Sequence, residues 1–276
     1  MSNTSLTVAL VTEVFPEPSD WKRLPEVLSL ARDKGAELAV LPEIPLNPWS
    51  PISKVARPED AEEVDGPRQE TLSAAASEVG IAVAGGAIIR DPDSGTRHNT
   101  ALVYDSSGSC LARYRKVHLP EEEGFWETSH YEPGNDPPSV VDGLSLRLGL
   151  QVCSDVNRTS GFQLLGAMGA EAVLAPRCTP PQTYDRWRLV LRADAVTSGT
   201  YVISVNRPAP TPDGLIGGPS IAISPTSEVL LETVEPLGVV ELRREAVEAA
   251  REDYPGYLKV FPEVYARGWR QVGGGE

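Results

Sequence analysis

The sequence predicts a single large α/β domain, and three observations support this. Short apolar runs alternate along the chain with segments that carry helix start and stop signals. Hydrophobic residues make up 41% of the 276 residues, enough for a sizeable core. No Ser/Gly-rich linker or charge block divides the chain. We therefore expect one domain over residues 1–276, with 253–276 as a C-terminal tail.

The first half of the chain predicts strands and helices in alternation. A strand over 6–11 leads through a Pro-rich turn to a helix over about 24–34, which Gly35 closes. The next strand, 38–41, is apolar throughout and ends in Pro42-Glu43. The elements that follow are a helix over 66–79, a strand over 81–89 that holds Gly85-Gly86, and a hairpin of strands 99–104 and 110–114.

The centre of the chain predicts a strand, a turn and a helix around Cys153. A largely apolar strand over 146–152 ends at this cysteine, a helix covers 161–168, and another buried strand covers 172–175. A thiol at a strand end faces a cleft, and unpaired N–H groups at a helix start favour the thiolate. The same residue could equally be a small buried hydrophobe, as free cysteines usually are.

The second half predicts a helix over 184–198, a strand over 201–205, a hairpin of 220–223 with 228–233, a strand over 239–242 and a helix over 243–251. The remaining tail is aromatic and lacks a clear helix. It carries Tyr257, Phe261, Tyr265 and Trp269, so it needs a surface to pack on, either its own core or another subunit.

Composition excludes several classes of function. The formal charge of -14 repels phosphate backbones and anionic membranes, so we expect no nucleic-acid or membrane partner. No apolar run is long enough to cross a bilayer, and residues 1–5 show no signal-peptide pattern. The three cysteines form no disulfide framework, which fits a reducing cytoplasm. The three histidines lack metal-ligand spacing, so we expect no metal.

Some isolated residues allow two interpretations. Glu43 follows a buried strand at the edge where open α/β sheets keep their ligand crevice, yet it could be a surface loop acid. Ser19 and Lys22 have the Ser-x-x-Lys spacing of serine amidases, but no companion motif follows and helix capping explains them. The Gly85-Gly86 pair lacks a phosphate-binding pattern and indicates close backbone packing.

Three segments in this order resemble the carbon-nitrogen hydrolase, or nitrilase, superfamily: Leu41-Pro42-Glu43, the Tyr114–Pro120 run, and Leu150–Asp155. Weaker pieces extend the resemblance over nearly the whole chain. They are Asn99–Leu102, Tyr131–Gly134, Gly169–Glu171, Gly218–Ser220 and Phe261–Tyr265. The resemblance implies a four-layer αββα sandwich, a homodimer or larger assembly, no cofactor, and a Glu-Lys-Cys triad at Glu43, Lys116 and Cys153.

The chemistry agrees with that triad. A thiol needs activation, and a neighbouring carboxylate, here Glu43, can act as its base. Attack on an amide carbonyl creates an oxyanion, for which Lys116 and the backbone N–H of Ser154 are suitable donors. Some family members carry a second glutamate ahead of the Pro-Gly. Glu127 matches that position, though it could also be one more loop acid.

The segment after Cys153 departs from the family pattern and leaves the substrate open. Tyr, Pro and Glu of the common run are missing, and Arg158 is displaced by one position. Arg158 and Arg177 could each bind a substrate carboxylate or form a surface salt bridge. We expect a hydrolase that cleaves a small amide or N-carbamoyl compound through a thioester on Cys153. A nitrile hydrolase and a family member that binds a small ligand without turnover are the alternatives.

Overall fold

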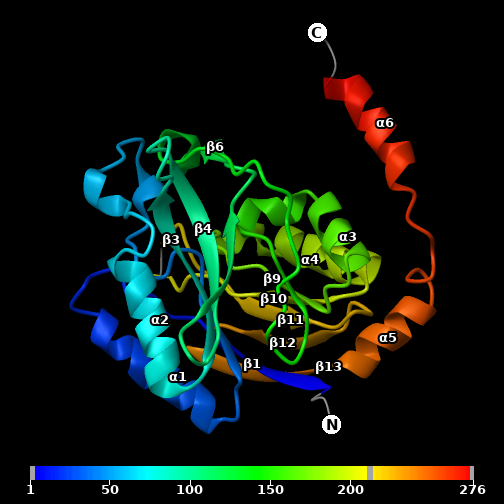
Figure 1. The fold of residues 1–276 in the computed structure, drawn as a ribbon, viewed down its shortest axis with the longest axis horizontal. Helices are drawn as coiled ribbons and strands as arrows, with labels where there is room; N and C mark the ends of the chain where they lie inside the picture. The colour runs from blue at the N-terminus through cyan, green and yellow to red at the C-terminus, as the bar shows by residue number, and fades with distance from the viewer. Residues whose placement is uncertain (1–3, 210–213, 274–276) are drawn as a thin grey trace.

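Two β-sheets lie face to face with helices on their outer sides, as the α/β prediction requires (Figure 1). The structure is a computed structural model, and it describes residues 4–209 and 214–273. The first sheet has six strands in the order β13 (Leu237–Arg243), β1 (Ser5–Val11), β2 (Leu38–Val40), β3 (Ala82–Arg90), β4 (Arg97–Tyr104) and β5 (Cys110–Arg115). The second has five, in the order β12 (Val229–Thr233), β11 (Ser220–Ile223), β10 (Tyr201–Ser204), β9 (Ala172–Leu174) and β8 (Leu148–Leu150). A two-stranded ribbon pairs β6 (Glu121–Glu122) with β7 (Phe125–Trp126).

Six α-helices flank or follow these sheets: α1 (Leu24–Asp33), α2 (Pro67–Val79), α3 (Ser160–Ala167), α4 (Tyr184–Ser198), α5 (Arg244–Glu252) and α6 (Pro262–Gly273). Both predicted hairpins are confirmed, because β4 pairs antiparallel with β5 and β11 with β12. Within the described ranges, no helix is both long and apolar enough to cross a membrane.

Three apolar clusters hold the layers together. The cluster between the sheets combines side chains of both, such as Leu10 with Ile203. A second packs Leu28 of α1 and Leu72 of α2 on the outer face of the six-stranded sheet, and a third packs α3 and α4 on the five-stranded sheet. Central strands such as β3 and β10 are nearly continuous apolar runs, because both of their faces are buried.

The carboxyl ends of parallel strands position the candidate catalytic residues. β1, β2 and β3 run parallel, as do β8, β9 and β10. Glu43 follows β2, Lys116 follows β5, and Cys153 follows β8. These last two strands are edge strands of different sheets, so the site forms where the two sheets meet.

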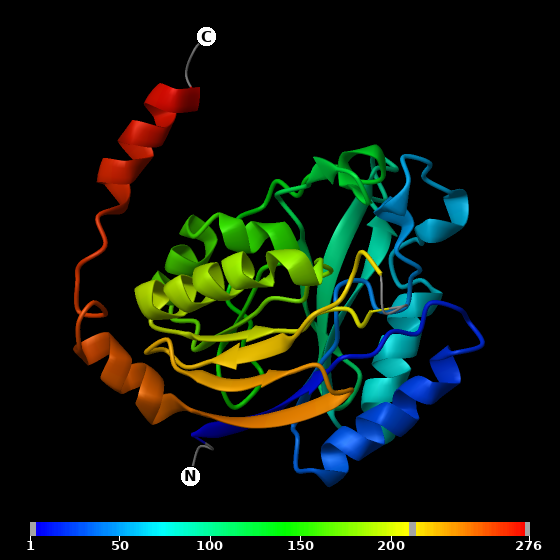
Figure 2. The ribbon, with the colours of Figure 1, turned by 180° about the vertical axis from the view of Figure 1, so that it is seen from behind.

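The prediction that the tail lacks a helix was wrong, because residues 262–273 form α6. In Figures 1 and 2 this helix stands apart from the sandwich. Tyr257, Phe261, Tyr265 and Trp269 are each 59–68% exposed. The spacing of the apolar residues was visible in the sequence, and Pro262, the first residue of α6, was an available start signal for this helix.

Asp194 on α4 is fully buried, and neither carboxyl oxygen has a hydrogen-bond partner among the described residues. Burial raises its pKa from 3.8 to about 8. Between about pH 4 and about pH 8, the folded state therefore holds a proton that the unfolded state has released. The free energy of unfolding falls as the pH rises through this range. We expect Asp194→Asn to raise Tm by roughly 5 °C at pH 9 and by almost nothing at pH 4. The exposed Asp185→Asn on the same helix is the control, and a pH-independent Tm difference would contradict the prediction.

Candidate active site

Glu43 lies at the end of β2 in a backbone turn that the rest of the protein holds in place. Its side chain is 1% exposed, and the next residue, Ile44, has φ of 39°. A β-branched residue seldom adopts this conformation, which is strained. The guanidinium of Arg207 donates to the backbone oxygens of Glu43, Ile44 and Asn47 at 3.0, 2.9 and 3.0 Å. These contacts compensate the strain and fix where the Glu43 carboxylate points.

The two oxygens of the Glu43 carboxylate have different environments. Oε1 accepts hydrogen bonds from Asn99 Nδ2 and Lys116 Nζ, each at 2.8 Å. Oε2 is buried and has no hydrogen-bond partner among the described residues. An unpaired buried carboxylate oxygen is costly, so its presence indicates a group with a task. Oε2 is free to accept a proton.

Lys116 is the centre of a buried Glu-Lys-Glu cluster. Its Nζ donates to Glu43 Oε1 and, at 2.7 Å, to each oxygen of Glu127. All three side chains are at most 1% exposed. Burial alone would lower the pKa of Lys116, but Glu127 and Glu43 raise it well above its usual value. Lys116 is therefore held as a cation, suited to receive negative charge.

Glu127 is part of this cluster rather than a solvent-exposed loop acid. It begins a short 3-10 helix over Glu127–Ser129 and is completely buried. Burial raises its pKa to about 8, against the attraction of Lys116. Glu121, Glu122 and Glu123 in the same loop are exposed.

Cys153 occupies a strained turn directly after β8. Its φ of 47° lies in the left-handed region, and its N–H donates to Pro176 O at 2.9 Å. The Sγ atom lies 3.7 Å from the carbonyl oxygen of Cys178, and the residue is 4% exposed. A five-residue 3-10 helix, Cys153–Asn157, begins at once, ahead of the predicted helix.

The surroundings of Cys153 raise the pKa of its thiol, contrary to the expectation that the turn favours the thiolate. Burial raises its pKa well above the usual value, and Glu43 raises it further, while Lys116 acts in the opposite direction. The sequence argument counted the cation and the N–H groups but not the desolvation or the neighbouring carboxylates. A protonated nucleophile needs a base at the moment of attack, and the free oxygen of Glu43 fits that need.

Ser154 and the loops around the cluster complete the site. Within the 3-10 helix, Asp155 N–H bonds back to Val152 O at 3.0 Å, which leaves the Ser154 N–H ahead of the helical hydrogen bonds. The loops that carry the acidic residues also contribute an apolar cluster that includes Trp49, Phe125, Tyr131, Cys178 and Ile216. Such surroundings lower the local dielectric and strengthen the electrostatic interactions of the cluster.

The structure separates the two predicted substrate arginines. Arg177 is fully buried beside the nucleophile turn, and its guanidinium donates to Ser204 Oγ, Thr179 Oγ1 and Pro219 O. Burial lowers its pKa to about 10, and it forms no ion pair with a carboxylate of the described residues. Arg158 is instead exposed and far less constrained.

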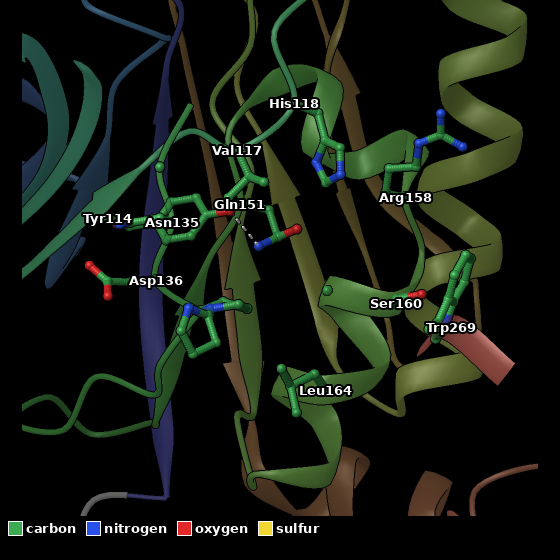
Figure 3. A pocket seen from close by; sticks show the side chains of 14 residues that line it. Tyr114, Val117, His118, Asn135, Asp136, Gln151, Arg158, Ser160, Leu164 and Trp269 are labelled. Atoms are coloured by element: carbon green, nitrogen blue, oxygen red, sulfur yellow. Dashed lines mark hydrogen bonds between the residues drawn. The ribbon is translucent and has the colours of Figure 1, made fainter. Parts of the chain in front are cut away.

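Arg158 lines a cavity of about 740 Å³ (Figure 3). Its other lining residues include Tyr114, His118, Gln151 and Trp269 of α6, but none of the four buried catalytic candidates. In Figure 3, Gln151 donates to Tyr114 Oη, a bond of 3.1 Å. This cavity lies next to the turn at Cys153, but Cys153 does not line it.

Sequence reasoning missed two contributors to the site, Asn99 and Arg207. Asn99 lies among the four polar residues that begin β4, Arg97–Thr100, so the pattern of the strand does not distinguish it from its neighbours. Arg207 reaches a loop at least 160 residues away in the sequence, which no local pattern indicates. Within the part of the chain that the structure describes, no group of His, Cys, Asp or Glu side chains could hold a metal ion.

Comparisons with known proteins relate the chain to amide-hydrolysing enzymes. The family described as carbon-nitrogen hydrolase matches residues 8–252. The chain is 31% identical over 233 residues to the omega-amidase NIT2 of Xenopus tropicalis, covering 82% of each chain. The solved structure of an amidase from Nesterenkonia sp. has a TM-score of 0.78 and 26% identity, covering 97% of each chain. A mutant of that amidase shows the acetamide moiety of fluoroacetamide added covalently at the active-site cysteine. Its structure has a TM-score of 0.75 and 26% identity, covering 96% of this chain and 97% of the mutant.

Proposed function

The chain belongs to the carbon-nitrogen hydrolase family, and from that premise we propose that it hydrolyses a small amide or N-carbamoyl compound through a thioester on Cys153. Membership makes it a hydrolase of carbon–nitrogen bonds other than peptide bonds. The omega-amidase and amidase relatives support an amide as the substrate. The observation that carries the cysteine mechanism is the unpaired Oε2 of Glu43 within the buried Glu-Lys-Glu cluster.

Acylation begins when Cys153 Sγ attacks the amide carbonyl and its proton passes to Glu43 Oε2. Lys116 Nζ and the Ser154 N–H stabilise the oxyanion of the tetrahedral intermediate. When the intermediate collapses, the carbon–nitrogen bond breaks and Glu43 returns the proton to the departing amine. The product of this half-reaction is a thioester on Cys153 and free ammonia or an amine.

Deacylation uses the same residues in reverse. Glu43 takes a proton from a water molecule as that water attacks the thioester carbonyl, and the same donors stabilise the second oxyanion. Collapse breaks the carbon–sulfur bond, the Cys153 sulfur recovers its proton, and the acid leaves. Glu127 keeps Lys116 in position through two hydrogen bonds of 2.7 Å in both halves of the cycle.

The test of this function is an activity panel of primary amides, N-carbamoyl amines and nitriles, with ammonia and carbon dioxide both measured. Ammonia alone from an amide identifies an amidase, ammonia from a nitrile identifies a nitrilase, and ammonia together with carbon dioxide identifies a carbamoylase. Substrates with and without a carboxylate elsewhere in the molecule test whether Arg177 or Arg158 recognises an anion. A chain that binds amides without releasing ammonia would support the alternative of a non-catalytic binder.

We predict that amides are turned over and nitriles are not. Ser154 and Asp155 follow the nucleophile, a Cys-x-Asp pattern that resembles the amidase branches. An amide gives an oxyanion that benefits from fixed donors, whereas a nitrile gives a thioimidate nitrogen that needs protonation. We expect a matched amide to release ammonia at least about 100-fold faster than its nitrile, on the scale of one oxyanion donor. Faster release from the nitrile would reverse this choice.

We also propose a homodimer or larger assembly held in part by the tail. The aromatic side chains of residues 254–269 are 59–70% exposed, which is unusual for so many large apolar groups in one segment. Light scattering at micromolar concentration is expected to give at least twice the chain mass of 29.7 kDa. The double substitution Phe261→Ser with Trp269→Ser should lower that mass, while Leu189→Ser, another exposed apolar position, should not. A wild-type monomer would refute the proposal.

All three cysteines are free, and the mechanism needs Cys153 reduced. We therefore propose a reducing compartment, such as the cytoplasm, as the place where this enzyme works.

A further inference from the structure

We propose that Asp155 is a positioning residue that sets the separation between the nucleophile and the catalytic lysine. This inference rests on the proposed cysteine mechanism and adds a residue to it. Asp155 is the third residue of the 3-10 helix that begins at Cys153, and its side chain is fully buried. Its side chain bonds to neither the Cys153 sulfur nor the Lys116 amino group, so its role is to act through its neighbours.

The two oxygens of Asp155 bind opposite sides of the site. Oδ2 accepts a hydrogen bond from the N–H of Val152, the residue before the nucleophile, at 3.2 Å. Oδ1 accepts from the N–H groups of Val117 and His118, the two residues after Lys116, at 3.2 and 2.8 Å. One carboxylate therefore links the backbone beside Cys153 to the backbone beside Lys116.

Side chains reinforce the same link. Tyr114 Oη donates to Oδ2 at 3.0 Å, and His118 Nδ1 lies 2.8 Å from Oδ1. At the rim, Ser154 Oγ donates to the carbonyl oxygen of His118. Tyr114 and His118 also line the cavity of about 740 Å³, and Figure 3 labels both side chains there. No Lys or Arg of the described chain pairs with Asp155, and its partners are N–H and O–H groups together with the imidazole of His118.

The link is needed because the sheet ladders do not supply it. Lys116 follows β5, the edge of the six-stranded sheet, and Cys153 follows β8, the edge of the five-stranded sheet. Apolar side chains pack between the sheets, and apolar packing has no preferred direction. A shift of about 1 Å between reacting groups can cost roughly 100-fold in rate. Asp155 supplies directional hydrogen bonds at the end of the sandwich where the chemistry occurs.

Asp155→Asn tests this with almost no change in side-chain volume. Both carboxylate oxygens face at least two donors, so either orientation of the amide places its NH₂ group against N–H or O–H groups. We expect kcat for the best amide to fall by about 100-fold while KM changes little, because substrate contacts are untouched. We also expect carbamidomethylation of Cys153 by iodoacetamide to slow on the order of tenfold, since the thiol moves relative to its base.

Asp60→Asn is the matched control. Asp60 is also buried, is also the third residue of a 3-10 helix, Pro58–Asp60, and also accepts the N–H of the cap residue, Arg57, at 3.1 Å. Its side chain bonds only to Arg57, so it forms no link to the catalytic lysine. We expect both variants to lose Tm to a similar extent, but only Asp155→Asn to lose kcat and alkylation rate.

The two readouts separate this inference from the proposed function. If the wild type releases no ammonia from any amide, the proposed function fails, while the alkylation rates of the two variants still decide the role of Asp155. The opposite result is an Asp155→Asn variant that keeps the wild-type kcat and the wild-type rate of Cys153 alkylation, while its Tm falls as in Asp60→Asn. This result would show that Asp155 only stabilises the fold, and it would overturn the proposal.

Discussion

Cys153→Ala is expected to abolish amide hydrolysis and leave the fold intact. The change removes the only atom proposed to bond to the substrate, and loss of a nucleophile costs roughly 10⁵-fold or more in kcat. The side chain is small and 4% exposed, so its deletion removes few contacts. The Tm of the variant should stay within a few degrees of wild type. The measurements are the rate of ammonia release from one amide and the Tm of thermal unfolding, each for the wild type and for Cys153→Ala.

Mass spectrometry locates the same step. Wild-type protein mixed with a slowly hydrolysed amide should gain the mass of the acyl group on Cys153, and Cys153→Ala should gain nothing. Cys178→Ala is the control, because this second buried cysteine lies beside the nucleophile and offers its backbone carbonyl, which the substitution keeps. Turnover near the wild-type level in Cys153→Ala would rule out the thioester mechanism.

The sequence was sufficient to predict most of the fold, because its elements are strongly patterned. The apolar run that became β3 lies between Gly80 and Pro92, and its predicted length matches the structure closely. The four-layer arrangement came from the family resemblance, since short buried strands do not by themselves indicate which sheet they join. α6 escaped prediction although its apolar residues recur at helical spacing, and in the structure these side chains are mostly exposed.

The candidate site shows the same division between local and long-range information. Glu43, Lys116, Glu127 and Cys153 could be assigned because each belongs to a recognisable segment, and the structure brings all four into mutual contact or close proximity. Their protonation could not be predicted. The pKa of Cys153 rises rather than falls because burial outweighs the cation, and burial at this point depends on loops such as the one around Trp49.

The contributions of Asn99, Asp155 and Arg207 could not be predicted for a related reason. Each acts by hydrogen bonds to residues far along the chain: 56 positions for Asn99 to Glu43, 37 for Asp155 to His118, and 164 for Arg207 to Glu43. Spacing patterns describe neighbours within an element, so they carry no information on such contacts. Only the meeting of the two sheets makes these residues part of the site.

Glu43→Gln is expected to lower kcat by about 1,000-fold, within the range of a general base, and to change its pH dependence. The glutamine oxygen can keep the hydrogen bonds from Asn99 and Lys116, but an NH₂ group replaces the free oxygen that takes the thiol proton. Because the pKa of Cys153 is raised well above its usual value, the variant should depend on spontaneous ionisation of the thiol, and its rate should rise tenfold per pH unit through neutral pH.

Glu127→Gln is the matched comparison, since it makes the same change on the other side of Lys116, where both oxygens only accept from Nζ. We expect that variant to lose about 10-fold to 100-fold without the steep rise with pH. An equal or larger loss in Glu127→Gln, or a flat pH profile in Glu43→Gln, would move the role of general base away from Glu43.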